Sequence, residues 1–174
     1  IAISARQEKE LKGQLKAIQT LWEEMEIPIK FNREKEVHLL GNMEELMSTL
    51  DESIAKLSQI EGNRHVAPLR EEVETWKEYL NCMQDAFEEW FQCQKTWLYL
   101  YAVFSAPDIK KKLPKVASTF DSVDKFFKST MKRASTKNNA LYLTVIEGRL
   151  VDQFKKQNKL LDSIQKHLDN YLEQ

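Results

Sequence analysis

Nucleotide binding is the first chemistry to test for, because a phosphate-binding loop has a recognisable residue spacing. Such a loop needs closely spaced glycines and a Gly-Lys-Ser or Gly-Lys-Thr step at the start of a helix. The four glycines of this chain are isolated from one another, and none precedes a lysine: Gly13, Gly41, Gly62 and Gly148. We therefore predict no P-loop and no cofactor bound by these 174 residues.

Residues that could hold a metal ion or act as a nucleophile are few and scattered. A metal site needs converging histidine, cysteine or carboxylate ligands, but His38, His65 and His167 fall in three different predicted elements. Neither Cys82 nor Cys93 has a histidine within one helical turn that would activate its thiol. The sequence therefore predicts no metal ligand and no catalytic residue.

The two cysteines also bear on the redox environment. Cys82 and Cys93 lie eleven positions apart in one predicted helix, which separates them by about 16 Å. A disulfide requires Cα atoms within about 7 Å of each other, so the pair stays reduced while the helix is intact. The N-terminus also lacks the basic and apolar regions of a secretory signal. Both features favour a reducing, intracellular compartment.

Charge is balanced over the whole chain but not along it. The 26 basic and 27 acidic residues give no reason to expect bulk attraction to nucleic acid or to an anionic membrane. The longest apolar run, residues 97–104, is far shorter than the roughly 20 residues that cross a bilayer. Basic side chains nevertheless gather in residues 110–137, and acidic side chains gather in residues 71–89.

Three interpretations of the basic run remain open. It is a solvated face balanced by the acidic stretch, a docking surface for an acidic partner, or a nucleic-acid site. The last is disfavoured, because no aromatic platform or recognition-helix turn accompanies the lysines. The candidate docking surface consists of Lys110, Lys111, Lys112, Lys115, Lys128, Lys132 and Arg133.

Hydrophobic spacing predicts the elements that would position these side chains. Apolar residues recur at intervals of three and four over residues 66–104, with Gln94 as the one polar interruption. This alternation is typical of coiled-coil packing. Pro68 fits a first helical turn and Pro107 ends the helix, so residues 66–106 are predicted to form one long central helix. Its last two turns are apolar on every side, and we expect that end to be buried by several partners.

Shorter elements surround this helix. The same spacing recurs in residues 150–171 and, more briefly, in residues 11–25, while residues 42–62 and 116–131 are also amphipathic. Residues 27–40 instead alternate apolar and polar on either side of a polar run, which predicts a β-hairpin inserted against the helices.

These elements together predict the fold class. We expect an all-α fold, an elongated antiparallel bundle of long heptad-patterned helices with one small β-hairpin. Residues 1–174 are expected to form a single partial domain, because the chain starts without Met and ends inside a helical pattern.

Bulky and polar residues on the apolar seams are the candidate structural site. The four tryptophans lie on seams, where core packing is the expected role and would stiffen the bundle. We hypothesise that Gln94 and Gln157 fix the register between helices at a cost in stability, so that Gln94→Leu would raise thermal stability. The seam residues are Trp22, Trp76, Trp90, Gln94, Trp97, Phe104, Ile164 and Leu168.

An ordered set of short motifs resembles the N-terminal linker region of dynein heavy chains, and the resemblance covers almost the whole sequence. The motifs are Glu72-Val73-Glu74-Thr75-Trp76, Trp90-Phe-Gln-Cys-Gln94-Lys-Thr-Trp97-Leu-Tyr-Leu100, Asp108-Ile109, Leu113-Pro114 and Leu161-x-x-Ile164-Gln165-Lys166-x-Leu168. Two features depart from the family pattern. Tyr101 stands where these proteins usually have an acidic residue, and the chain ends before the Lys-Arg and Phe-Pro-Arg-Phe stretch that normally follows.

The resemblance implies a mechanical role in a motor. In dyneins the linker lies across a ring of AAA+ modules and changes angle as ATP is bound and hydrolysed. The implied partners are the AAA+ modules of the same heavy chain, the dynein tail with its associated chains and, indirectly, microtubules. ATP and Mg would bind elsewhere in the parent chain, and neither nucleic acid nor membrane is an expected partner.

The residues in these motifs resemble those of axonemal heavy chains more than those of cytoplasmic heavy chains. The resemblance therefore implies the axoneme of a cilium or flagellum as the location, with the cytoplasm as the alternative. A stand-alone helical scaffold or a spectrin-like interaction module is the alternative function.

Overall fold

A computed structural model describes residues 2–173 and shows an all-α fold, as predicted. Within these residues the helices are α1 (Ala2–Glu24), α2 (Glu44–Glu61), α3 (Arg70–Phe104), α4 (Pro107–Lys112), α5 (Pro114–Thr136) and α6 (Leu150–Glu173). One antiparallel hairpin, of strands β1 (Ile29–Asn32) and β2 (Val37–Leu40), separates α1 from α2. A 3₁₀ turn (Ala67–Leu69) and a π-helical turn (Tyr142–Ile146) precede α3 and α6.

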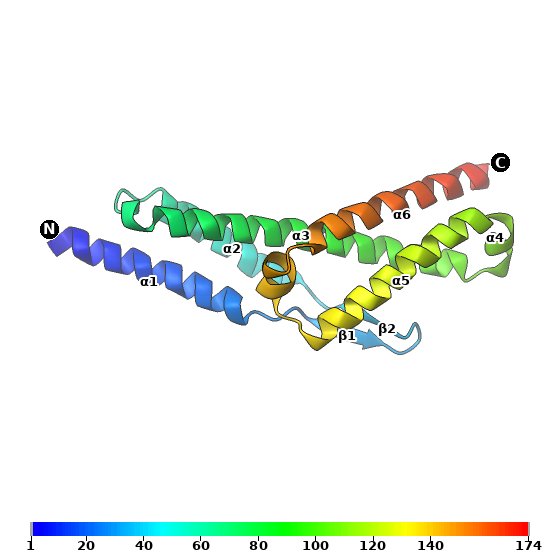
Figure 1. Cartoon of the computed structure of the whole chain (residues 1–174), viewed down its shortest axis with the longest axis horizontal. Coiled ribbons are helices and arrows are strands. Elements are labelled where there is room, and N and C mark those ends of the chain that lie inside the picture. The colour runs from blue at the N-terminus through cyan, green and yellow to red at the C-terminus, as the bar shows by residue number, and fades with distance from the viewer. Residues whose placement is uncertain (1, 174) are drawn as a thin grey trace.

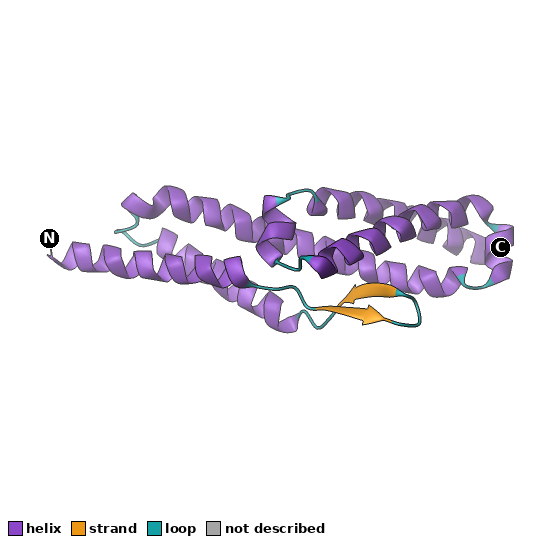
Figure 2. Ribbon diagram, turned by 60° about the horizontal axis from the view of Figure 1, so that its bottom comes forward, coloured by secondary structure: helices purple, strands orange, loops and turns teal. Residues whose placement is uncertain are grey.

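The molecule is elongated, with its two termini at opposite ends (Figure 1). Helix α3 runs along most of its length, about 52 Å for 35 residues. We call α1, α2 and residues 70–87 of α3 the N-terminal half, and residues 88–104 of α3 with α4, α5 and α6 the C-terminal half. The hairpin lies alongside the C-terminal half (Figure 2), where β2 contacts α5 and α3.

Helix α3 follows the predicted seam but is not buried as predicted at its end. Pro68 lies in the 3₁₀ turn before the helix, and Pro107 starts α4 immediately after it. The expectation that several partners would bury the last two turns was wrong for part of their surface, since Trp97, Leu100 and Phe104 are buried but Tyr99 is not. Tyr99 is 52% exposed, although α4, α5 and α6 all contact α3.

The hairpin register places the alternating apolar residues of the two strands on opposite faces. Lys30 pairs with Leu39, so the face that carries Leu39 is not the face that carries Ile29. Ile29 pairs with Leu40 and Asn32 with Val37. The Asn32 side-chain oxygen accepts a hydrogen bond from the Lys35 backbone N–H at 3.0 Å, which stabilises the turn. This small sheet obtains its stability from helices α3 and α5, as a two-stranded hairpin must.

Two connecting elements were not predicted from the sequence. One is the short helix α4, and the other is the π-helical turn that leads into α6. Gly148 follows that turn with φ of +72°, and a Cβ at this position would lie 3.1 Å from the Val145 carbonyl oxygen. A glycine is therefore required for the chain to reverse into α6.

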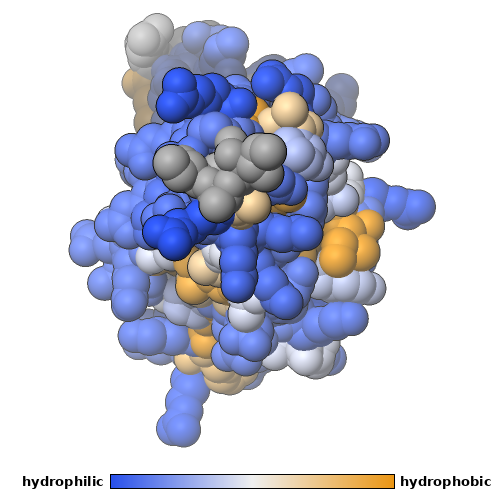
Figure 3. Space-filling model, turned by 90° about the vertical axis from the view of Figure 1, so that its left-hand side faces the viewer, coloured by the Kyte–Doolittle hydropathy of each residue, from blue (hydrophilic) through white to orange (hydrophobic). Residues whose placement is uncertain are grey.

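The N-terminal end of the molecule presents a mainly hydrophilic surface. Figure 3, viewed from the N-terminal end, shows charged and polar residues over most of that face, with small separate hydrophobic patches. Across residues 2–173, no helix combines the length and the apolar character needed to span a membrane.

Candidate functional site: the packed seam and the basic surface

The structure places the predicted seam residues in the core. Trp22, Trp90 and Trp97 are fully buried, and Trp76 is 8% exposed at the rim. The apolar seam residues of α3 and α6 are buried as well: Phe104, Ile164 and Leu168.

In the C-terminal half the seam is built from stacked aromatic rings. The Trp97 ring lies 4.8 Å from the Phe127 ring of α5, and the Phe104 ring lies 5.1 Å from Phe120, also in α5. Trp90 stacks on Phe154 of α6 at 5.3 Å. Two of these pairs join α3 to α5 and one joins α3 to α6. Such contacts contribute about 0.5–1.5 kcal/mol beyond the area they bury.

The buried indole N–H groups also join separate elements. Trp97 donates a hydrogen bond to the Asp124 carboxylate at 2.8 Å, which links α3 to α5. Trp22 donates to the Ser53 hydroxyl at 2.9 Å and thereby links α1 to α2. Both bonds satisfy polar groups that would otherwise be buried without a partner.

Gln94 is held by the hairpin rather than by a neighbouring helix. Its side-chain oxygen accepts a hydrogen bond from the Leu40 N–H at 2.7 Å, and its amide donates to the Leu40 carbonyl at 3.4 Å. The residue therefore fixes β2 against α3. Since these bonds satisfy both backbone groups of Leu40, the structure reverses the expectation that Gln94→Leu would be stabilising.

The second seam glutamine does not fix a register in the described chain. The Gln157 side-chain oxygen is buried without a hydrogen-bond partner. The neighbouring Asn158 takes that role, because its amide donates to the Glu89 carbonyl at 2.9 Å and to the Glu89 carboxylate at 2.7 Å. Nothing in the heptad pattern distinguishes Asn158, so sequence reasoning missed it.

A set of hydrogen bonds at the middle of the molecule joins two segments more than 110 positions apart in the sequence. We call residues 23–27 and 138–142 the central clasp. The Ile27 N–H donates to the Asn138 carbonyl at 2.7 Å, and the Ala140 N–H donates to the Met25 carbonyl at 2.9 Å. The Asn139 amide donates to the Glu23 carbonyl at 2.8 Å.

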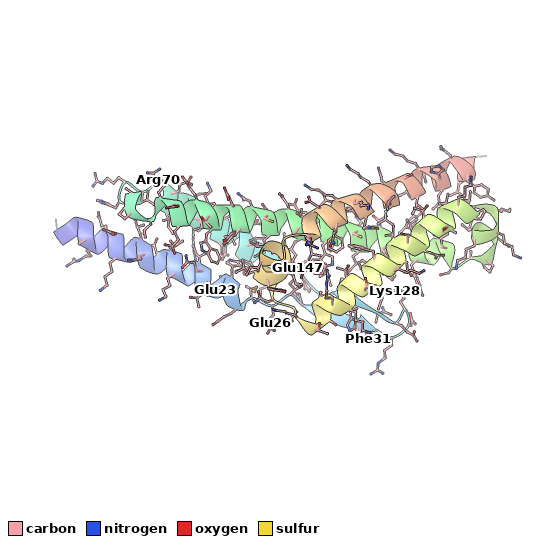
Figure 4. All side chains as sticks on the ribbon, in the orientation of Figure 1. Glu23, Glu26, Phe31, Arg70, Lys128 and Glu147 are labelled. Atoms are coloured by element: carbon pink, nitrogen blue, oxygen red, sulfur yellow. The ribbon has the colours of Figure 1, made fainter. Side chains whose placement is uncertain are left out.

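The clasp ties the end of α1 to the connection between α5 and α6. Figure 4 labels Glu23 and Glu26, which lie at and just after the end of α1, and Glu147, which lies in the connection to α6. An ion pair between Arg133 and Glu147, at 3.2 Å, adds a link within the C-terminal side of the crossing. The Asn-Asn pair at 138–139 carried no periodic signal, so the clasp was missing from the sequence analysis.

The seven basic candidates lie on α4 and along α5, and Lys110 and Lys128 line one pocket together. Lys110, Lys111, Lys112 and Lys115 are exposed on α4 and at the start of α5. The other three lie in the second half of α5. The distance from Lys115 to Lys132 along the helix is about 25 Å.

The two groups also differ in their partners. Lys128 pairs with Asp124 at 3.1 Å and Arg133 pairs with Glu147. For the lysines of α4 and the start of α5, the described residues provide no ion pair within 4.0 Å. Lys132, in the second group, also has no ion pair with a described residue, so the groups differ at Lys128 and Arg133.

The thiols are free and unsuited to nucleophilic chemistry. Burial, with a smaller contribution from the nearby Glu89, raises the pKa of Cys93 to about 12. Burial also raises the pKa of Cys82, whose thiol lies 3.5 Å from the Thr144 carbonyl. Both groups are protonated at neutral pH. In the part of the chain that is described, no three metal-ligating side chains converge.

The sequence of the whole chain matches one protein family. Residues 1–174 match the profile of dynein heavy chain, N-terminal region 2. The chain belongs to the dynein heavy chain family. The match covers the entire bundle, including the seam and the clasp, and it favours this family over a spectrin-like module.

Individual dynein heavy chains are similar over nearly the full length of this chain. Human dynein axonemal heavy chain 6 is 36% identical over 174 residues, and human dynein axonemal heavy chain 2 is 32% identical over 173 residues. Rat dynein axonemal heavy chain 12 is 30% identical over 173 residues. Each alignment covers 99% of this chain but only 4–6% of the relative, so the chain spans a small part of the relatives' length.

Proposed function

We propose that this dynein heavy chain segment is a mechanical linker. In this proposal it acts as a lever that couples the ATP cycle of an AAA+ ring, elsewhere in the parent chain, to movement along microtubules. The parent would then be a microtubule-motor ATPase with ATP and Mg bound outside these residues. Its partners would be the ring modules of the same chain, the tail with its associated chains and, indirectly, microtubules.

The observation that carries this proposal is the continuity of α3 through both halves of the molecule. A helix of 35 residues packs against α2 at one end and against α5 and α6 at the other. Close-packed interiors have low compressibility and transmit strain. A bundle with one continuous helix, bonded across its middle by the clasp, is suited to carrying force from end to end.

The test is to weaken the clasp in the full-length heavy chain. In a variant carrying Asn138→Ala and Asn139→Ala, microtubule gliding velocity should fall several-fold while the ATP turnover rate changes little. The control is Asn170→Ala, at an exposed position on α6, which should leave both rates unchanged.

The outcome against the proposal is also defined. If hydrogen exchange shows that the clasp has opened and gliding velocity is still unchanged, these residues do not transmit force. That result would count against the linker proposal, because the connection between the two halves through the clasp would then play no part in movement.

We further propose the axoneme of a cilium or flagellum as the location, because the relatives reported above are named as axonemal chains. An antibody against this segment should detect a very large polypeptide in ciliary extracts. A band near the mass of the 174-residue chain itself would instead favour the stand-alone scaffold.

A further inference from the structure

A groove opens between the start of α5 and the outer part of α6, at the end of the molecule farthest from the N-terminus. It has a volume of about 500 Å³. Its floor is apolar and is formed by Leu113, Val116 and Ile164, of which Ile164 is buried and the other two are half-buried. The sequence pattern alone did not predict a groove here.

The rim of this groove is basic. Lys112 and Lys115 line one side and His167 lines the other, and all three side chains are exposed. Lys110 and Lys111 lie beside them on α4. Asp121 and Asp124 line a separate pocket together with Lys110. Lys112 Nζ lies 5.9 Å from the centre of the Tyr171 ring, and within the described chain none of these lysines forms an ion pair within 4.0 Å.

We propose that this groove binds an acidic amphipathic segment of another polypeptide. One or two apolar side chains of the segment would occupy the floor, and its carboxylates would lie against Lys112 and Lys115. Charge complementarity selects this occupant, because the rim carries lysines that have no acidic partner within the described chain. Protein interfaces combine an apolar core with a polar rim. A ligand that carried only charge would contact the lysines but would leave the apolar floor exposed to water.

A polypeptide fits the groove better than a nucleic acid does. Single-stranded nucleic acids are bound by aromatic rings on which bases stack, and none of the residues lining the groove is a tryptophan, tyrosine or phenylalanine. The proposal goes beyond the mechanical function above, because a lever needs no ligand at this end.

The binding test uses the full-length heavy chain and a defined probe. The probe is a fluorescein-labelled helical peptide of glutamates with two leucines on one face, and a second peptide has both leucines replaced by serine. Fluorescence anisotropy should show saturable binding of the first peptide. The serine peptide should bind at least tenfold more weakly, because it cannot use the apolar floor.

Two variants and one control assign the binding to this groove. The double variant Lys112→Glu and Lys115→Glu should weaken binding of the leucine peptide at least tenfold by reversing the rim charge. Ser163→Trp, at an exposed lining residue, should weaken binding to a similar extent by filling the groove without changing its charge. Lys125→Glu, at an exposed position of α5 outside the lining, should have no effect, and limited proteolysis should show that all variants stay folded.

Several results would overturn the proposal. They are equal binding of the two peptides, undiminished binding to Ser163→Trp, equal competition by an oligonucleotide, or no binding because another part of the heavy chain covers the groove. Since the assay uses neither ATP nor microtubules, these results would not bear on the linker function.

Discussion

The two halves of the molecule are stabilised by different kinds of packing. In the C-terminal half, α3 is held to α5 and α6 by stacked rings such as Trp97 on Phe127 and Trp90 on Phe154. In the N-terminal half the buried contacts are mostly aliphatic, and α1 presents one apolar stripe to its neighbours while its other faces are exposed. Rigidity should therefore be greatest in the C-terminal half.

The difference follows from how much surface each kind of residue removes from water. An aromatic side chain buries about 150–250 Å², and aromatic pairs prefer defined stacked or edge-to-face geometries. A buried leucine stabilises the fold by about 1.5–3 kcal/mol through burial alone, which has no directional preference. The clasp and the Gln94 bonds to Leu40 lie where the two kinds of packing meet. The predictions below test this contrast, beginning with the largest expected effect.

Truncating a stacked ring should cost more than truncating a leucine of α1. We expect Trp97→Ala to lower the free energy of unfolding by about 3–5 kcal/mol, because it empties a fully buried site and removes the hydrogen bond to Asp124. Leu11→Ala, at a 5% exposed site, should cost about 2 kcal/mol. Urea denaturation measures both values, and equal losses would contradict the contrast between the halves.

The two seam glutamines should respond in opposite ways to the same substitution. Gln94→Leu should lower the free energy of unfolding by about 1–3 kcal/mol, since it leaves the N–H and carbonyl of Leu40 without their partner. Gln157→Leu is the matched control and should be neutral or stabilising, because its buried oxygen has no partner. Thermal denaturation of both variants checks this, and a stabilised Gln94→Leu variant would restore the sequence-based expectation.

The clasp should determine how firmly the end of α1 is attached. Asn139→Ala removes the bond to the Glu23 carbonyl and the bond accepted from the Tyr142 N–H, both at 2.8 Å. A loss of about 1 kcal/mol for each bond is expected. Hydrogen exchange should accelerate at residues 20–27 and remain slow in the middle of α3. Faster exchange throughout the bundle would mean that the halves unfold together.

The last prediction concerns the pH dependence of Cys93, which has no effect on stability at neutral pH. Its pKa is about 12 in the folded state, against an ordinary value of 9.0, so the folded state holds this proton more tightly than the unfolded state does. The stabilising contribution is complete below pH 9 and is lost as the pH rises toward 12. The difference between the unfolding curves of the native chain and Cys93→Ala should therefore narrow above pH 9, and a constant difference would contradict the shift.

Several features of the fold could be predicted from the spacing of apolar residues in the sequence. The alternation of three and four over residues 66–104 predicted the long helix and its buried tryptophans, because heptad spacing places those residues on one face whatever they pack against. The alternation in residues 27–40 predicted the hairpin for the same kind of local reason. The exposure of Tyr99 could not be predicted, since it depends on which side of α3 the other helices occupy.

The sequence by itself determined the helical class, the apolar seams and membership in the dynein heavy chain family, because these follow from local periodicity and from ordered motifs. Only the tertiary structure decided which partners the polar residues take. Gln94 reaches Leu40, Asn139 reaches Glu23, and the lysines near α4 surround an apolar groove. Each of these arrangements joins segments whose separation in space is set by the packing of the bundle, and no local pattern encodes that distance.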